Sequence, residues 1–119
     1  MRSKPEELRD RTKAFALRII RLFRSLPYKT DTQVLGKQLL RCGTSVAANY
    51  RSACRARSKA EFVARIAIVA EESDDAVLWL ELLTESGIVK AELAAEHLKE
   101  AKELAAILTT SQQTAKRTV

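Results

Sequence analysis

The amino-acid sequence predicts an all-α protein folded as an up-down-up-down antiparallel four-helix bundle. The chain of 119 residues contains only 3 glycines and 2 prolines, and Ala, Leu, Glu, Lys and Arg dominate it, as they do in helical proteins. Apolar residues recur at steps of three and four in four long segments. Because the connections between these segments are short, consecutive helices should run antiparallel, and residues 1–119 should form a single domain.

The first helix is expected over residues 4–26. Ser3 and Glu6 have the spacing of a capping box, and Pro5 suits the first turn of a helix. Pro27 should end this helix because the residue before a proline is disfavoured in the helical conformation.

The second helix is expected over residues 31–56, after a second capping-box pattern formed by Thr30 and Gln33. Gly36 and Gly43 each cost a helix about 1 kcal/mol relative to alanine. Together with nearby Ser and Ala residues they make one side of this helix small. That side should allow another helix to approach closely.

The third and fourth helices are expected over residues 59–86 and 90–111. Ser58 and Glu61 form a third capping-box pattern, and Gly87 has the position of a C-terminal cap. The tail, residues 112–119, is polar and is expected to fray.

Several classes of protein are disfavoured by simple features of the chain. No run of about 18 apolar residues is present, so no membrane span is expected, and the first residues do not resemble a secretory signal. Cys42 and Cys54 would lie roughly 18 Å apart along one helix, too far for a disulfide. We therefore expect a cytoplasmic protein with reduced thiols and no membrane partner.

Catalytic, metal and cofactor sites are also not predicted. A di-iron bundle needs Glu-x-x-His motifs, but the only histidine is His97 and the residue three before it is Ala94. No glycine-rich phosphate loop is present, and no small-molecule substrate is implied. The acidic run Glu71–Asp75 is better explained by solvation or by pairing with arginines than by acid–base chemistry.

Charge is distributed unevenly along the chain. Residues 1–65 contain 16 Lys and Arg against 5 Asp and Glu, whereas residues 66–119 contain 5 against 10. The net charges of the two parts are therefore +11 and −5. This asymmetry indicates either a polyanionic partner or electrostatic pairing within or between chains.

The stretch NYRSACRARSK, residues 49–59, concentrates the positive charge at the end of the second helix. Cations there also favour the helix macrodipole, so a structural explanation is available. Phosphate binding by such a surface would be electrostatic and independent of sequence, since only Tyr28 and Tyr50 are available for stacking on bases. The candidate phosphate-binding residues are Arg11, Arg18, Arg21, Arg24, Lys37, Arg41, Arg51 and Arg55.

Residues 26–89 carry the motifs TSVAANYR, RARSKAEF and EESDDAVLWLELL. With these motifs the chain resembles the bacterial four-helix-bundle family that includes proteins encoded in intervening sequences of large-subunit ribosomal RNA genes. The same family includes the accessory variability determinants of diversity-generating retroelements. Ser52 and Ser73 depart from the related subgroup, which has Glu and Ala at these positions.

This resemblance implies a ring-shaped homopentamer without catalytic residues. In the retroelement proteins it also implies a basic surface that serves nucleic acid and a reverse transcriptase.

Two hypotheses for function follow, and an enzyme is the least favoured alternative. The first is a non-enzymatic homo-oligomeric adaptor whose basic surface binds RNA or DNA, or a ribonucleoprotein. The second is a purely structural assembly module, in which Arg51, Arg55 or Arg57 pairs with acids of the next protomer. The interface residues are then Arg57, Glu71, Glu72, Asp74, Asp75 and Trp79.

Overall fold

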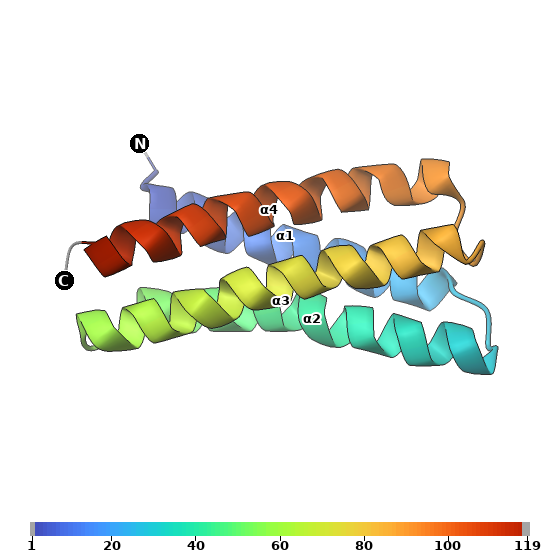
Figure 1. Cartoon of the computed structure of the whole chain (residues 1–119), viewed down its shortest axis with the longest axis horizontal. Helices are drawn as coiled ribbons and strands as arrows, with labels where there is room; N and C mark the ends of the chain where they lie inside the picture. The colour runs from blue at the N-terminus through green and yellow to red at the C-terminus, as the bar shows by residue number, and fades with distance from the viewer. Residues whose placement is uncertain (1, 118–119) are drawn as a thin grey trace.

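The computed structural model describes residues 2–117 and confirms the all-α four-helix bundle (Figure 1). The helices are α1 (Lys4–Ser25), α2 (Thr30–Cys54), α3 (Lys59–Glu85) and α4 (Ala91–Arg117). The α1–α2 and α3–α4 connections lie at one end of the bundle, and the α2–α3 connection lies at the other end, near both termini. Each helix packs on the next along the chain, and α1 also meets α4, more sparsely, whereas α1 and α3 lie diagonally across the bundle.

The core runs along the centre of the bundle, where every helix contributes one apolar side. Burial of these side chains is the main stabilising contribution, because most helical stability in proteins comes from tertiary packing. The largest fully buried side chains are Phe15, Ile19, Leu39, Val46, Ile66, Val69, Leu80, Leu83, Leu104 and Leu108.

The small side of α2 packs against α1, as the sequence predicts. A Cβ atom placed on Gly43 would lie 3.0 Å from Cγ2 of Ile19. One placed on Gly36 would lie 2.8 Å from Cδ1 of Leu26. Both glycines therefore allow α1 to approach the α2 backbone closely.

The capping-box predictions have different outcomes at the first two helices. Ser3 caps α1, and the reciprocal contact with the Glu6 side chain is present. The prediction for Thr30 is wrong, because Thr30 is already helical and the N-cap residue is Lys29, which makes no side-chain cap. Gln33 instead donates from Nε2 to the carbonyl of Pro27, 3.2 Å away.

The ends of the later helices also differ from expectation. Helix α2 ends at Cys54, two residues before the predicted 56. Gly87 has a φ of 84°, in the left-handed region typical of a residue that ends a helix. The predicted fraying of residues 112–117 is wrong, because α4 continues to Arg117 and buries Ala115. That segment lacks glycine and proline, and its terminal cations favour the macrodipole; residues 118 and 119 lie outside the described part of the chain.

Candidate nucleic-acid interface

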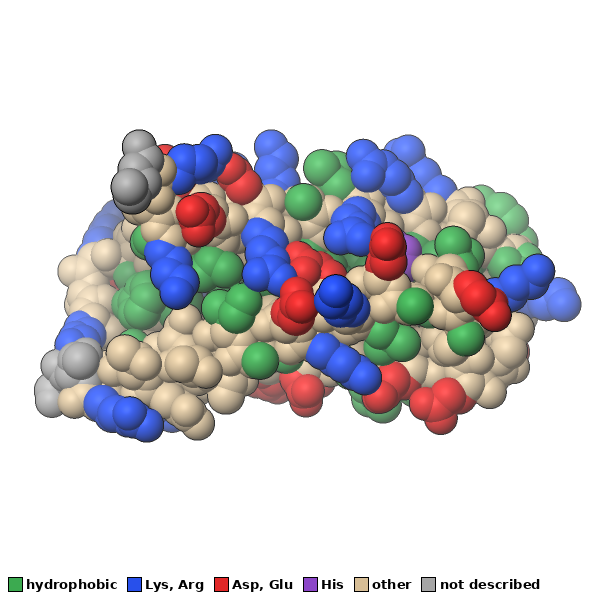
Figure 2. Space-filling view, turned by 90° about the horizontal axis from the view of Figure 1, so that it is seen from above, with side chains coloured by type: hydrophobic (Ala, Val, Ile, Leu, Met, Phe, Trp, Pro, Cys, Tyr) green, Lys and Arg blue, Asp and Glu red, His purple; other side chains and the backbone are tan. Residues whose placement is uncertain are grey.

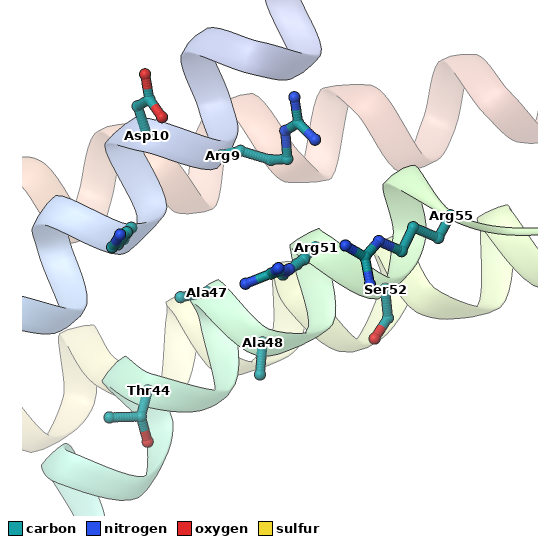
Figure 3. A pocket seen from close by; sticks show the side chains of 9 residues that line it. Arg9, Asp10, Thr44, Ala47, Ala48, Arg51, Ser52 and Arg55 are labelled. Carbon is teal, nitrogen blue, oxygen red and sulfur yellow. The ribbon is translucent and has the colours of Figure 1, made fainter.

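A groove runs between α1 and α2, towards the end of the bundle where α1 begins and α2 ends (Figure 3). Its volume is about 630 Å³. Small side chains of α2 form its floor, which leaves space between the two helices. These floor residues are Thr44, Ala47, Ala48 and Ser52.

Four cationic side chains line this groove. Arg9 and Lys13 come from α1, and Arg51 and Arg55 come from α2. Each pair has i,i+4 spacing, which places its members on one side of their helix, about 6 Å apart along the axis. All four are exposed, and within residues 2–117 none of them forms an ion pair. We call these four residues and the floor the basic groove.

The remaining lining residue is acidic, but its charge is already compensated. Asp10 forms an ion pair with Arg2. The four cations of the basic groove are therefore not neutralised from within the described chain. Among residues 2–117, no aromatic side chain lines the basic groove, so these residues offer charge and hydrogen-bond donors to an anion without a surface for stacking.

Arg11, a predicted phosphate-binding residue, is engaged inside the protein. It forms a two-point contact with Glu100, with Nε and Nη2 donating over 2.8 and 2.7 Å. Nη2 also donates to Glu103 over 2.6 Å. The hydrogen bond from Arg11 lowers the pKa of the Glu100 carboxyl, and the same bond raises the pKa of Arg11. Arg11 thus connects α1 to α4.

Arg18 lies on the same side of α1 and pairs with Glu96 at 3.5 Å. His97 is adjacent, with a buried Nδ1 that has no hydrogen-bond partner in the described structure. Burial, followed by the charge of Arg18, lowers the pKa of His97. Figure 2 looks onto the side formed by α1 and α4, where acidic and basic side chains are interspersed.

Arg41 contacts a cluster between α2 and α3. Its Nη1 lies 2.8 Å from Oε2 of Glu72, and its Nη2 lies 3.3 Å from Sγ of Cys42. The ligand atoms of Cys42, Glu72 and Asp75 lie within 4.8 Å of one another. Burial and the nearby Glu72 raise the pKa of the Cys42 thiol to about 11. A protonated thiol beside a bound guanidinium has a structural explanation and does not require a metal.

Two residues of the predicted interface therefore have contacts within the chain. Glu72 is buried and paired with Arg41, which accounts for its charge inside the chain. Trp79 is half-buried against the core. Its indole does not contribute a large exposed surface.

The other predicted cations lie apart from one another. Arg21, Arg24 and Lys37 are exposed, and none forms an ion pair in the described chain. Arg57 lies in the α2–α3 turn, where its backbone N–H donates to Oε2 of Glu61 over 3.1 Å. Glu61 is thus directed to Arg57, while its own N–H donates to the cap residue Ser58.

The predicted acids of α3 lie on a helix side that is also apolar. Glu71 and Asp74 are exposed, whereas Asp75 is half-buried. Leu78 and Leu82 are also exposed on this side. Among residues 2–117, none of these acids forms an ion pair with Arg51 or Arg55 of the same chain.

Two members of the basic groove, Arg9 and Lys13, were not among the sequence-predicted candidates. Their i,i+4 spacing was a readable signal. The sequence did not show that this side of α1 lies beside the small side of α2. The predicted set therefore divides into groove residues, residues paired with acids of a neighbouring helix and separate surface residues.

Among the described residues, no helix combines the length and the apolar character that crossing a bilayer requires. A search of curated proteins returned no match. One solved structure that the chain resembles is a protein with unknown function from the S23 ribosomal protein family of Bacteroides thetaiotaomicron VPI-5482. The two chains are 31% identical, with a TM-score of 0.85 over 93% of this chain and 99% of the other.

The sequence model of the 23S rRNA-intervening sequence protein family matches residues 6–110. This match covers most of the chain, including all of α2 and α3 and most of α1 and α4. Since the solved relative has the same fold over nearly its whole length, the fold comparison agrees with the sequence comparison. The chain belongs to the 23S rRNA-intervening sequence protein family.

Proposed function

We propose that this protein is a non-enzymatic, self-assembling cytoplasmic adaptor that binds nucleic acid through its basic groove. The observation that carries this proposal is the set of four cations, Arg9, Lys13, Arg51 and Arg55, around one hollow. Two of these cations come from α1 and two from α2, so the packing of the two helices brings them together. An uncompensated group of this kind attracts a polyanion, because phosphate neutralisation supplies most of the affinity in non-specific binding.

The lining of the groove favours the sugar–phosphate backbone as the recognised element. Proteins that read unpaired RNA bases stack them on aromatic side chains, and the described residues that line the groove include none. Backbone contacts position a strand without reading its sequence. We therefore expect RNA and single-stranded DNA to bind with similar affinity.

Self-assembly is the second part of the proposal, with a homopentamer as the expected form from the family resemblance. Exposed leucines on α3, Leu78 and Leu82, support it. An adaptor that carries several grooves in one particle gains avidity for a long polyanion. A reverse transcriptase is the candidate protein partner, by resemblance to the retroelement accessory proteins.

The competing proposal is a purely structural assembly module whose charges pair only between protomers. The acids exposed beside the α3 leucines, Glu71 and Asp74, favour it. In that case the groove cations would be covered by the acidic side of another copy, and polyanions would not bind. Measurement of binding against salt concentration separates the two proposals.

The test is fluorescence anisotropy with labelled structured RNA, single-stranded RNA and single-stranded DNA at increasing salt. Four phosphate contacts predict a log–log slope of about −2.8 per groove for a single strand, or an affinity loss of about 50-fold between 50 and 200 mM salt. Absence of binding at the lowest salt would refute the adaptor proposal and leave the assembly module.

The basic groove is tested with a matched pair of variants. Arg51→Glu with Arg55→Glu removes two of the four contacts, which predicts a loss of roughly 15-fold at 150 mM salt from the lost counterion release alone. Lys99→Glu with Lys102→Glu makes the same change in net charge on the exposed side of α4. Equal weakening by both pairs would show that binding is diffuse and that the groove is not the site.

A further inference from the structure

Helix α3 exposes apolar side chains on the side opposite the core. Ile68, Leu78 and Leu82 are 40%, 47% and 39% exposed, although α3 already buries a full apolar side in the bundle. A helix that is apolar on both sides is normally buried on both. We define the α3 outer face as the exposed residues Ile68, Glu71, Asp74, Leu78, Leu82 and Glu85.

The acids of this face restrict what can cover it. Glu71, Asp74 and Glu85 are exposed and form no ion pair in residues 2–117. Two α3 outer faces packed on each other would bring like charges together, which is unfavourable. The partner surface must therefore be apolar and cationic.

Helix α1 carries a surface with these properties. Leu17 is 43% exposed, and Arg21 and Arg24 follow it at steps of four and three. Neither arginine has an ion-pair partner in the described chain. We define the α1 outer face as the exposed residues Ala14, Leu17, Arg21 and Arg24.

The other cationic surface, on α2, fits less well. Arg51 and Arg55 lie beside small floor residues, and Val34 is the large exposed apolar residue of α2, more than four turns away. Arg41, between them, is already bound to Glu72. The α2 surface thus offers charge with little apolar area near it.

We infer that the α3 outer face binds the α1 outer face of a second copy of this chain. This inference rests on the proposed self-assembly and names the surfaces that produce it. Because α1 and α3 occupy diagonal positions in the bundle, the two outer faces point in different directions. The contact is therefore heterologous, and each added copy leaves one face free, which leads to a closed ring or a filament.

The assembly leaves most of the basic groove accessible. Arg9, Arg51 and Arg55 lie between α1 and α2 and are not on either outer face, whereas Lys13 lies four residues before Leu17 and borders the α1 outer face. Assembly and nucleic-acid binding should therefore be separable by mutation.

The test uses two variants, each with one outer face altered so that like charges meet. Leu17→Glu places an acid opposite the α3 acids, and Leu78→Arg with Leu82→Arg places cations opposite Arg21 and Arg24. Mass is measured by light scattering during gel filtration, with helix content checked by circular dichroism. The wild type is expected to be larger than a dimer, and each variant alone is expected to be monomeric.

Mixing the two variants gives the decisive result. The Leu17→Glu chain keeps an intact α3 outer face, and the doubly substituted chain keeps an intact α1 outer face. An equimolar mixture should therefore associate, although neither variant does so alone.

Other outcomes would overturn the inference and identify which part fails. A wild-type assembly that survives either face variant, or a mixture that remains monomeric, would refute the assigned faces while leaving self-assembly in place. A monomeric or strictly dimeric wild type would refute heterologous assembly itself. RNA binding is measured on the monomer with Leu78→Arg and Leu82→Arg, whose substitutions lie on α3 and outside the basic groove. Comparing it with and without Arg51→Glu and Arg55→Glu reports on the groove independently of assembly.

Discussion

Gly43 is the position where the close approach of α1 to α2 can be tested quantitatively. An alanine Cβ at this position would lie 3.0 Å from Cγ2 of Ile19, and 3.1 Å from its Cβ and Cγ1. These atoms surround the branched Cβ of Ile19, whose place is set by the backbone, so a rotamer change cannot clear the contact. Replacing glycine by alanine should gain about 1 kcal/mol of helix propensity, whereas overpacking should cost about 1–3 kcal/mol. Gly43→Ala is therefore expected to lower the free energy of unfolding by about 1 kcal/mol.

Gly36→Ala provides the matched control, because its neighbours can move. Its nearest atom is the terminal Cδ1 of Leu26 at 2.8 Å, followed by the ring of half-buried Phe23 at 3.1 Å. The gain in helix propensity should dominate there, giving a change between zero and about +1 kcal/mol. Urea unfolding followed by circular dichroism at fixed protein concentration measures the free energy of unfolding of both variants. If Gly43→Ala is as stable as the wild type, or more stable, the argument from the Ile19 contact is wrong.

Three further predictions concern the charged contacts. Arg11→Ala should lower the free energy of unfolding by about 1–2 kcal/mol, since the substitution removes charge-assisted hydrogen bonds that are partly exposed. The control Arg57→Ala, at an exposed turn, should change the free energy of unfolding by less than about 0.5 kcal/mol, and equal effects of the two substitutions would contradict the prediction. A double-mutant cycle of unfolding free energies with Arg41→Ala and Glu72→Gln should show a coupling of about 0.5–1.5 kcal/mol, because Glu72 is buried while Arg41 is exposed. Additive effects of the two substitutions would contradict a stabilising contact between Arg41 and Glu72. Burial lowers the pKa of His97 in the folded state. The contribution of neutral His97 to stability is therefore complete above its unfolded pKa of about 6.5 and is lost as pH falls below that value. His97→Gln should remove this decline in melting temperature between about pH 7 and pH 5, and an unchanged pH profile would contradict the prediction.

The helices and several of their ends were predictable because they depend on neighbouring residues. The capping box of Ser3, the break at Pro27 and the left-handed Gly87 each act within about one turn of chain. The apolar period likewise depends only on spacing along a helix. The failure at Thr30 shows the limit of this reasoning, since a capping pattern identifies possible partners but not which residue leaves the helix first.

The division of the arginines among separate roles was not predictable in the same way. Arg11 contacts Glu100 across 89 positions of sequence, and Arg41 contacts Glu72 across 31. A few tens of degrees of rotation about a helix axis determine whether such a side chain meets a neighbouring helix or solvent, and the apolar pattern does not resolve that rotation.

Local chemistry in the sequence thus accounts for an all-α chain of four antiparallel helices with an excess of positive charge in its first half. Packing accounts for where that charge becomes concentrated. Arg9 and Lys13 join Arg51 and Arg55 because the floor of α2 is small enough to leave a hollow beside α1. The physical reason is that helix formation depends on contacts a few residues apart, whereas a binding surface depends on how separate helices are rotated and spaced.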